Sequence, residues 1–496
     1  MATEAKDHQP SIPPTPSHRP RSAASTALAK MGLLMSRSNR RAAGDHNGSK
    51  TDTESAVPPD DDDDLGPAPP AISPPTRRRP SAATNNTQSS AGAAGERAEP
   101  RLAVLERIPT YLQPSLPWRE RLLHFTFAWY TVTMSTSGIA MILALTPHRF
   151  PGLSTIGLII FLLDLVFFVF ITVAIILRFT LYQHTLRRAF TRPHEALFIS
   201  TFWLSVAAIL SNIDEYGRIF LTPQRYSGLA GFMRVAFWVY LAITFTFSVG
   251  QYHLLFTVKE ERRLTVSAMT PAWILPIFPV MLAGTLATPC SRGQAAESAI
   301  KILSAGLAAQ GLGILVSVFF YSTYLSRLMA FGLPVQRPGM FIAVGPPSFT
   351  CSALVSMAGE VPRVFRELAG QGVLEGYSGL VDANTLTAAV KLLAINSAVF
   401  LWGLSFWFFA SASVAVMAGM PDRKFHLSWW SFVFPNVGFT LASIRMGKTL
   451  GNEGLLWFSS VMSVLLFLAW AFIAFRCVRA VYQREIVWPG HDEDSE

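Results

Sequence analysis

The sequence predicts an all-α integral membrane protein with ten transmembrane helices, arranged as five helical hairpins around a central pore. Three observations support this fold class. The chain has 496 residues, of which 50% are hydrophobic and 15% charged, whereas soluble domains carry about 25% charged residues. After Trp118, apolar segments long enough to cross a bilayer follow one another closely. Alternate segments carry small, polar or helix-breaking residues near their centres.

The N-terminal stretch, residues 1–105, has a different composition. It is rich in Pro, Ser, Ala and Thr, and it holds an acidic run, Asp60–Asp64, and a basic run, Arg77–Arg79. Because it offers too little apolar surface to offset the entropy lost on folding, we predict a disordered cytosolic tail. Its Ser-Pro and Thr-Pro pairs leave two interpretations open, a phosphorylated tail and a plain solvated one.

The transmembrane domain is predicted at 106–480, followed by a short cytosolic C-terminal tail at 481–496. Each predicted span provides the ~20 residues that cross ~30 Å of hydrocarbon. The ten spans are 123–146, 153–177, 195–213, 228–256, 271–289, 298–326, 340–360, 386–418, 428–446 and 453–475.

Basic residues flank both ends of this domain. Arg119 and Arg121 precede the first span, and Arg476, Arg479 and Arg484 follow the last. Because basic residues concentrate on the cytosolic side of a membrane, both termini are predicted to be cytosolic. The same rule accounts for the excess of 41 Lys and Arg over 32 Asp and Glu, which is scattered over short loops. We therefore expect the lipid bilayer, and not nucleic acid, to be the partner.

The spans alternate in character. The even spans are mostly apolar, whereas at least four of the odd spans are interrupted near mid-membrane. Irregular backbone at that depth is tolerated only where it is buried in protein or lines a water-filled cavity. The odd spans are thus predicted to form an inner ring that lines a conduit, and close helix packing through small residues is the alternative. The candidate pore-lining residues are Ser135, Thr136, Gly138, Pro276, Pro279, Gly345, Pro346, Pro347, Ser348, Pro435, Asn436 and Gly438.

The ninth span is interrupted directly after Phe434 by Pro435, Asn436 and Gly438. Proline has no N–H to donate and its ring presses against the carbonyl four residues back, so we expect a kink just before Pro435, with Phe434 at the bend.

No odd span carries Lys, Arg, Asp or Glu at its centre. The remaining hydroxyl and backbone contacts favour conduction of an anion, because weak binding permits exit.

Several stretches carry a family resemblance. They are His124–Gly138, Pro271–Pro279, Arg337–Phe341, Val344–Pro347, Phe434–Phe439 and Pro489–Asp494. In this order they are similar to the tellurite-resistance/dicarboxylate transporter family, and within it to the fungal malic-acid (C4-dicarboxylate) permeases. The likeness runs from about residue 108 to the end of the chain. It implies ten helices in five hairpins around a pore, commonly as a homotrimer with one pore per subunit. Plant slow anion channels resemble the same family, and a phenylalanine on their ninth helix closes the pore.

The matching position in this sequence is Phe434, which the resemblance implies is the pore gate. The alternative is a phenylalanine that packs against a neighbouring helix. Asp164, in the middle of the second span, is expected to be protonated, paired or in contact with a cavity, because a carboxylate in lipid is costly. A structural hydrogen-bonding role is favoured for Asp164, since its helix is an outer one, and coupling of transport to protons is the alternative.

Three functions follow from these observations. The first is a plasma-membrane transporter for malate and related C4-dicarboxylates, acting as an anion channel or a proton symporter. The second is a sulfite efflux pump of the same family. The third is a membrane scaffold or receptor whose tail binds partners, although a scaffold needs no conduit. The sequence contains no Walker-type phosphate loop and no catalytic or metal-ligand constellation, so we predict no catalytic residue, no metal and no cofactor.

Overall fold

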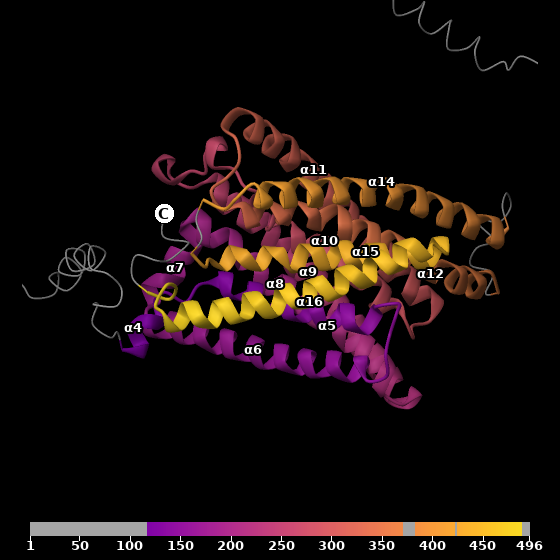
Figure 1. The fold of residues 1–496 in the computed structure, drawn as a ribbon. Helices are drawn as coiled ribbons and strands as arrows, with labels where there is room; N and C mark the ends of the chain where they lie inside the picture. The colour runs from indigo at the N-terminus through magenta and orange to yellow at the C-terminus, as the bar shows by residue number, and fades with distance from the viewer. Residues whose placement is uncertain (1–116, 371–381, 422–423, 489–496) are drawn as a thin grey trace, which may run out of the picture. The chain divides into compact units, whose positions relative to one another are not determined.

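Long helices that run side by side make up the described part of this computed structural model, residues 117–370, 382–421 and 424–488 (Figure 1). No strand occurs among these residues, which confirms the all-α fold class. Two short helices are α4 (Trp118–Leu122) and α7 (Gln183–Thr191). The longer helices are α5 (Tyr130–Leu145), α6 (Leu153–Leu181), α8 (Pro193–Phe220), α9 (Pro223–Phe256), α10 (Phe278–Ser291), α11 (Ala296–Phe331), α12 (Gly345–Gly370), α14 (Ala383–Met417), α15 (Phe434–Leu450) and α16 (Glu453–Tyr482).

Eight helical segments of the described residues are long and apolar enough to cross a membrane, as expected of a multi-pass membrane protein. The helices α10 and α15 are shorter, with 14 and 17 residues. Each of them follows a 3₁₀ segment, η5 (Pro271–Ile274) and η7 (Leu427–Phe432) respectively. The count of ten membrane spans therefore stays a prediction.

The interruptions expected in three odd spans are transitions from a 3₁₀ segment to an α-helix. Pro279, Pro346 and Pro435 are the second residues of α10, α12 and α15. Proline is tolerated at that position because its missing N–H would have no partner within the helix. The kink expected inside a continuous helix at Pro435 is thus wrong in detail, since α15 begins at Phe434 and the chain before it is 3₁₀.

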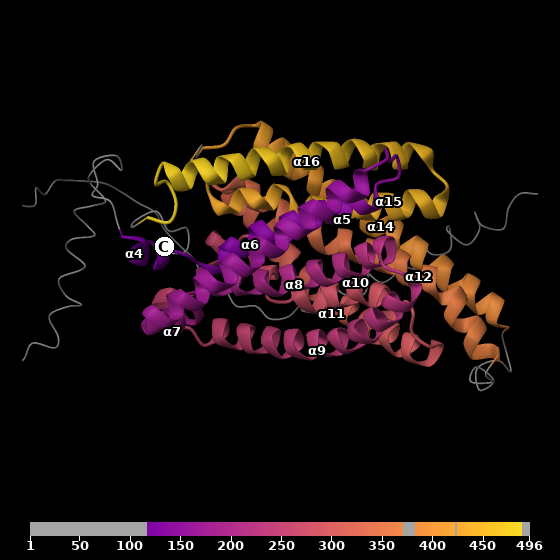
Figure 2. The same ribbon diagram turned by 90° about the horizontal axis from the view of Figure 1, so that it is seen from below.

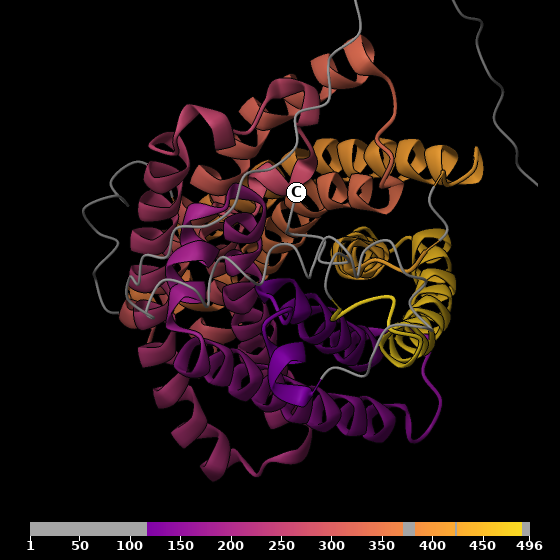
Figure 3. The same ribbon diagram turned by 90° about the vertical axis from the view of Figure 1, so that its left-hand side faces the viewer.

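Five helices, α5, α8, α10, α12 and α15, contact one another in cyclic order, and α15 returns to α5. We call these the inner helices. The next long helix after each one, α6, α9, α11, α14 or α16, packs against it and also contacts the following inner helix. We call these the outer helices. Figure 2 shows where the cycle closes, with α16 beside α5, and Figure 3 views the bundle from the left-hand side of Figure 1.

Burial follows the predicted alternation. In each outer helix, at most 39% of the residues in its most apolar stretch of 18 are buried. In the inner helical segments that are long enough to cross a membrane, at least 61% of the corresponding residues are buried. The helices α10 and α15 are buried over most of their length. The outer helices therefore expose apolar side chains to lipid, and the inner helices form the core.

The predicted domain limits are only partly within the described residues. The tail predicted at 1–105 lies outside them, as does the second half, 489–496, of the tail predicted at 481–496. The helix α16 continues to Tyr482, past the predicted end of the transmembrane domain at residue 480.

Candidate functional site

A central cavity lies between the inner helices, and every inner helix contributes to its lining. The apolar and polar lining includes Gly138 of α5, Asn212 of α8, Thr285 of α10, Phe349 of α12 and Leu441 of α15. Four charged side chains also line it, Asp214, Glu215, Arg292 and Arg445. A wall of this composition offers hydroxyl, amide and guanidinium donors to a small anion.

Three phenylalanine rings meet where α10, α12 and α15 begin, and we call Phe278, Phe349 and Phe434 the aromatic cluster. The ring of Phe434 stacks on that of Phe349, with centroids 5.2 Å apart, and lies tilted to that of Phe278 at 6.3 Å. The rings of Phe278 and Phe349 meet edge to face at 5.8 Å. All three side chains are buried. Because Phe349 and Phe434 also line the central cavity, the cluster forms part of its wall.

Two glycines make room for these rings. A Cβ atom built on Gly345 would lie 2.7 Å from Cζ of Phe278, and one built on Gly438 would lie 2.6 Å from Cε2 of Phe349. Real Cβ atoms do not approach other atoms so closely. Both glycines belong to the predicted pore-lining set, and in the structure they admit rings of the aromatic cluster.

The predicted pore-lining residues are all buried, but they do not share one surface. Gly138 lines the central cavity together with the predicted gate, Phe434. Thr136 instead accepts a hydrogen bond from Nε1 of Trp470 on α16, at 3.0 Å, so its hydroxyl faces an outer helix. The others lie outside the lining of the central cavity: Ser135, Pro276, Pro279, Gly345, Pro346, Pro347, Ser348, Pro435, Asn436 and Gly438.

A second, larger cavity of about 520 Å³ lies near η5, η7 and the N-terminal end of α8. Its lining includes His194, Trp273, Arg327 and His426, and it shares no lining residue with the central cavity. Along the chain, Phe278 lies between Trp273, which lines the second cavity, and α10 residues that line the central one. Phe278 therefore separates residues of the two cavities along the chain.

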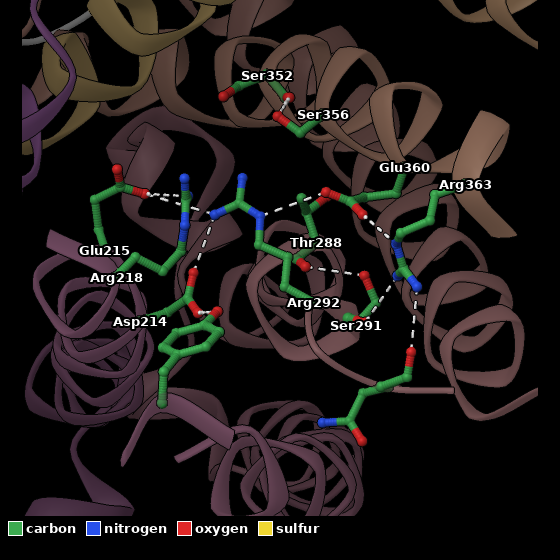
Figure 4. Close-up of polar contacts among 12 residues, drawn as sticks. Asp214, Glu215, Arg218, Thr288, Ser291, Arg292, Ser352, Ser356, Glu360 and Arg363 are labelled. Carbon is green, nitrogen blue, oxygen red and sulfur yellow. Dashed lines mark hydrogen bonds and ion pairs between the residues drawn. The ribbon is translucent and has the colours of Figure 1, made fainter. Parts of the chain in front are cut away.

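An ionic network surrounds Arg292, which directly follows α10 (Figure 4). Its Nη1 lies 3.0 Å from Oδ2 of Asp214 and 3.5 Å from Oε2 of Glu215, and its Nε lies 3.4 Å from Oε1 of Glu360. Glu360 also pairs with Arg363 at 3.4 Å. The network links the C-terminal halves of α8 and α12 to the residue that follows α10. These residues lie at the ends of the predicted spans, so the absence of charge at span centres does not reveal the network.

Arg445 was also missed, although its position follows a regular spacing. Phe434, Val437, Leu441 and Arg445 recur every three or four residues and line the central cavity together. Such spacing places side chains on one face of a helix. This pattern can be read from the sequence, and it identifies Arg445 as a cavity residue.

Asp164 is fully buried, although it belongs to the outer helix α6. Its carboxyl group interacts with Ser137 of α5, whose hydroxyl accepts a hydrogen bond of 2.8 Å from Nδ2 of Asn212. Ser137 and Asn212 line the central cavity. Neither carboxylate oxygen of Asp164 completes a hydrogen bond within the described residues. One side chain thus separates this acid from the cavity.

Comparison with known proteins identifies the family. A family model described as voltage-dependent anion channel matches residues 124–478. The chain belongs to this family. The match confirms the family resemblance of the sequence, and it spans all the inner helices of this anion-channel homologue.

Relatives of this anion-channel homologue include proteins named for malic acid transport and for sulfite efflux. The malic acid transport protein of Schizosaccharomyces pombe is 32% identical over 391 residues, which cover 77% of this chain and 84% of the relative. A putative malic acid transport protein of the same organism is 32% identical over 386 residues, covering 77% and 85%. The sulfite efflux pump of Trichophyton rubrum is 25% identical over 336 residues, covering 66% and 82%.

Proposed function

We propose that this protein moves malate and related C4-dicarboxylate anions across the plasma membrane along a path between the five inner helices. In this proposal ten helical segments cross the bilayer as five hairpins, with α10 and α15 extended by their 3₁₀ segments. The observation that carries it is the closed cycle of inner helices around a cavity lined by two arginines. Two relatives named for malic acid transport, each 32% identical, support the substrate class.

The chemistry of the inner helices suits an anion path. Hydroxyl, amide and guanidinium groups can replace part of the hydration of an anion without the strong trapping that would prevent exit. The helices α10, α12 and α15 begin at or near the aromatic cluster, and a helix N-terminus carries partial positive charge. Broken helices whose ends point at a substrate path are typical of transporters. The predicted pore-lining residues keep this role in the proposal.

Phe434 is the gate in this proposal. Its ring lines the central cavity and packs against Phe278 and Phe349, and these contacts support a position on a path between the two cavities. An apolar ring blocks a hydrated anion by its bulk and also by excluding water from the constriction. Movement of one side chain would then connect the cavities.

Asp164 provides a route to proton-linked transport. A structural acid would be expected to hold hydrogen bonds, but neither oxygen of Asp164 completes one within the described residues. Its neighbour Ser137 lines the central cavity. An ionisable residue inside a membrane is a functional candidate by default. We therefore include Asp164 as the proton-coupling residue of the proposed path.

Sulfite efflux is the second candidate function. It is supported by the sulfite efflux pump at 25% identity, and the same arginines suit sulfite as well as carboxylates. A scaffold role is less well supported, because packing alone does not require arginines that face a cavity.

Uptake by a yeast strain without its own carriers tests the substrate. Cells that express the full chain are given labelled malate, succinate or sulfite, and uptake is divided by the amount of protein at the surface. We expect saturable uptake of malate and succinate above that of the empty strain. Movement of sulfite alone would replace the proposed function by sulfite transport, and movement of none of the three would end it.

Orientation and assembly form part of the proposal. Basic flanks support cytosolic termini, which protease protection of terminal tags in intact cells would test. The homotrimer rests on the family resemblance, and the mass of the purified protein in detergent, corrected for bound detergent, would test it. Accessible tags or a monomeric mass would contradict these two statements.

A further inference from the structure

Arg445 occupies the cavity-lining face of α15, roughly three turns or about 16 Å from Phe434. It is the last of the four residues on this face, after Phe434, Val437 and Leu441. A charged side chain inside a membrane domain is costly, so it is normally paired or facing a polar cavity. The positive charge of Arg445 is therefore expected to have a negatively charged or polar partner in or near the cavity.

The partners of Arg445 are neutral. Its Nη1 donates to the carbonyl oxygen of Ser352 at 3.0 Å and to the hydroxyl oxygen of the same residue at 2.7 Å. Ser352 is fully buried on α12, and its carbonyl also accepts from the hydroxyl of Ser356 at 2.8 Å (Figure 4). These bonds fix one corner of the guanidinium group and add no negative charge.

The contrast with Arg292 shows what is missing. Three carboxylates lie within 3.5 Å of Arg292. Among the described residues, no carboxylate lies within 4.0 Å of Arg445, although Glu215 and Arg292 are near enough to interact with it electrostatically. Arg292 thus pairs directly with carboxylates, whereas Arg445 pairs directly with none in the part of the chain that the structure describes.

An unused donor lines the same cavity from α10. The hydroxyl oxygen of Thr285 is buried, has no hydrogen-bond partner within the described residues, and belongs to a residue that lines the central cavity. A guanidinium group presents a planar fork that fits the two oxygens of an oxyanion, and a hydroxyl adds a further donor. An oxyanion would supply a hydrogen-bond acceptor for Thr285 and a negatively charged partner for Arg445.

We infer that Arg445, anchored by Ser352 and assisted by Thr285, binds an oxyanionic group of the transported anion in the central cavity. For malate the bound group is one carboxylate, and this part of the inference rests on the proposed function. Arg445 and Phe434 are the last and the first cavity-lining residues of α15, so the proposed binding site and the proposed gate lie at opposite ends of this face. An anion would therefore bind at Arg445 either before or after it passes Phe434.

Purified full-length protein in liposomes tests the site. Initial rates of labelled malate uptake are measured over a range of concentrations for the wild type, Arg445→Gln, Arg445→Lys and Thr285→Val. The matched control is Arg366→Gln, which removes the same charge from an exposed residue of α12. We expect Arg445→Gln to raise the half-saturating malate concentration by about 10- to 100-fold, because a hydrogen bond to a charged group is lost. The Lys variant should show a smaller increase, and the control no change.

Each outcome is decisive. An unchanged half-saturating concentration in Arg445→Gln, while the wild type moves malate, overturns the site and leaves the proposed function intact. If the wild type moves sulfite and not malate, the proposed substrate is wrong and the same comparison with sulfite judges the site. If neither moves, thermal stabilisation of the detergent-purified protein by malate or sulfite decides, and stabilisation independent of Arg445, or none, overturns the site. If Arg445→Gln does not fold, a half-saturating malate concentration in Arg445→Lys equal to that of the wild type overturns the proposed site.

Discussion

The ring of Phe349 fills the space that a side chain on Gly438 would need, with Cε2 of Phe349 only 2.6 Å from where that Cβ atom would lie. Phe349 stacks in turn on Phe434 at 5.2 Å. The position of the proposed gate thus depends on a glycine one turn further along α15. Any atom added at Gly438 displaces Phe349 and, through it, Phe434.

We expect Gly438→Ala to lower the free energy of unfolding by about 1–3 kcal/mol, because the added methyl overpacks the aromatic cluster. Thermal unfolding in detergent measures this. Gly250→Ala on α9 is the matched control, since nothing lies within 4 Å of a Cβ at Gly250, and alanine there should stabilise by up to about 1 kcal/mol. Combining Gly438→Ala with Phe349→Leu should recover part of the loss. Equal behaviour of the two glycine variants would contradict the close contact.

Phe434→Ala is expected to raise malate flux per molecule, because in the proposed function its ring closes the path between the two cavities. Flux normalised to surface protein is the measurement. Phe400→Ala, at an exposed position of α14, is the control and should leave flux unchanged. If Phe434 only packs, truncation leaves a cavity that costs about 3–5 kcal/mol, and surface protein falls while flux per molecule stays constant.

Arg292→Gln should destabilise the protein by about 3 kcal/mol, because Asp214, Glu215 and Glu360 lose their shared partner and Asp214 is almost fully buried. Thermal unfolding again gives the measurement. The control is Lys301→Gln, which breaks an exposed pair with Glu297 and should cost less than about 1 kcal/mol. A loss at Arg292 no larger than at Lys301 would show that the network does not hold the inner helices together.

Asp164→Asn keeps the size of the side chain and removes its titration. We expect malate uptake driven by the malate gradient to persist and its response to a pH gradient to disappear, because Asp164 adjoins the cavity through Ser137. Uptake into liposomes with and without an imposed pH gradient separates the two. A pH response equal to that of the wild type would return Asp164 to a structural role.

Much of the fold can be predicted from the sequence, because lipid permits few backbone arrangements. The alternation of apolar and interrupted segments anticipates which helices are buried. The sequence does not reveal that Pro279, Pro346 and Pro435 start helices, because a proline that kinks a helix and one that begins it have the same local pattern. Boundaries of this kind depend on the backbone hydrogen bonds before the proline.

The candidate site is less predictable for a different reason. Phe278 and Phe349 reach Phe434 from other helices, and nothing in the local sequence specifies such contacts. Thr136 has the composition of a pore residue, yet its partner is Trp470, more than three hundred residues away. Arg445 is the exception, because its spacing from Phe434 is visible along one helix. The spacing of residues along one helix therefore predicts which side chains share a face. Which residues of other helices they contact depends on tertiary packing.

The contacts between outer and inner helices also predict how transport responds to tension in the membrane. Each outer helix touches two neighbouring inner helices, and the cycle has no free seam. Widening the ring of inner helices would break several of these contacts together, whereas rotation of the Phe434 side chain disturbs its ring contacts with Phe278 and Phe349 and leaves the helix backbones in place. Opening by rotation of the Phe434 side chain leaves the cross-sectional area of the protein in the bilayer unchanged. Membrane tension therefore contributes no free energy to this opening. Flux through this protein should therefore be insensitive to stretching of the membrane.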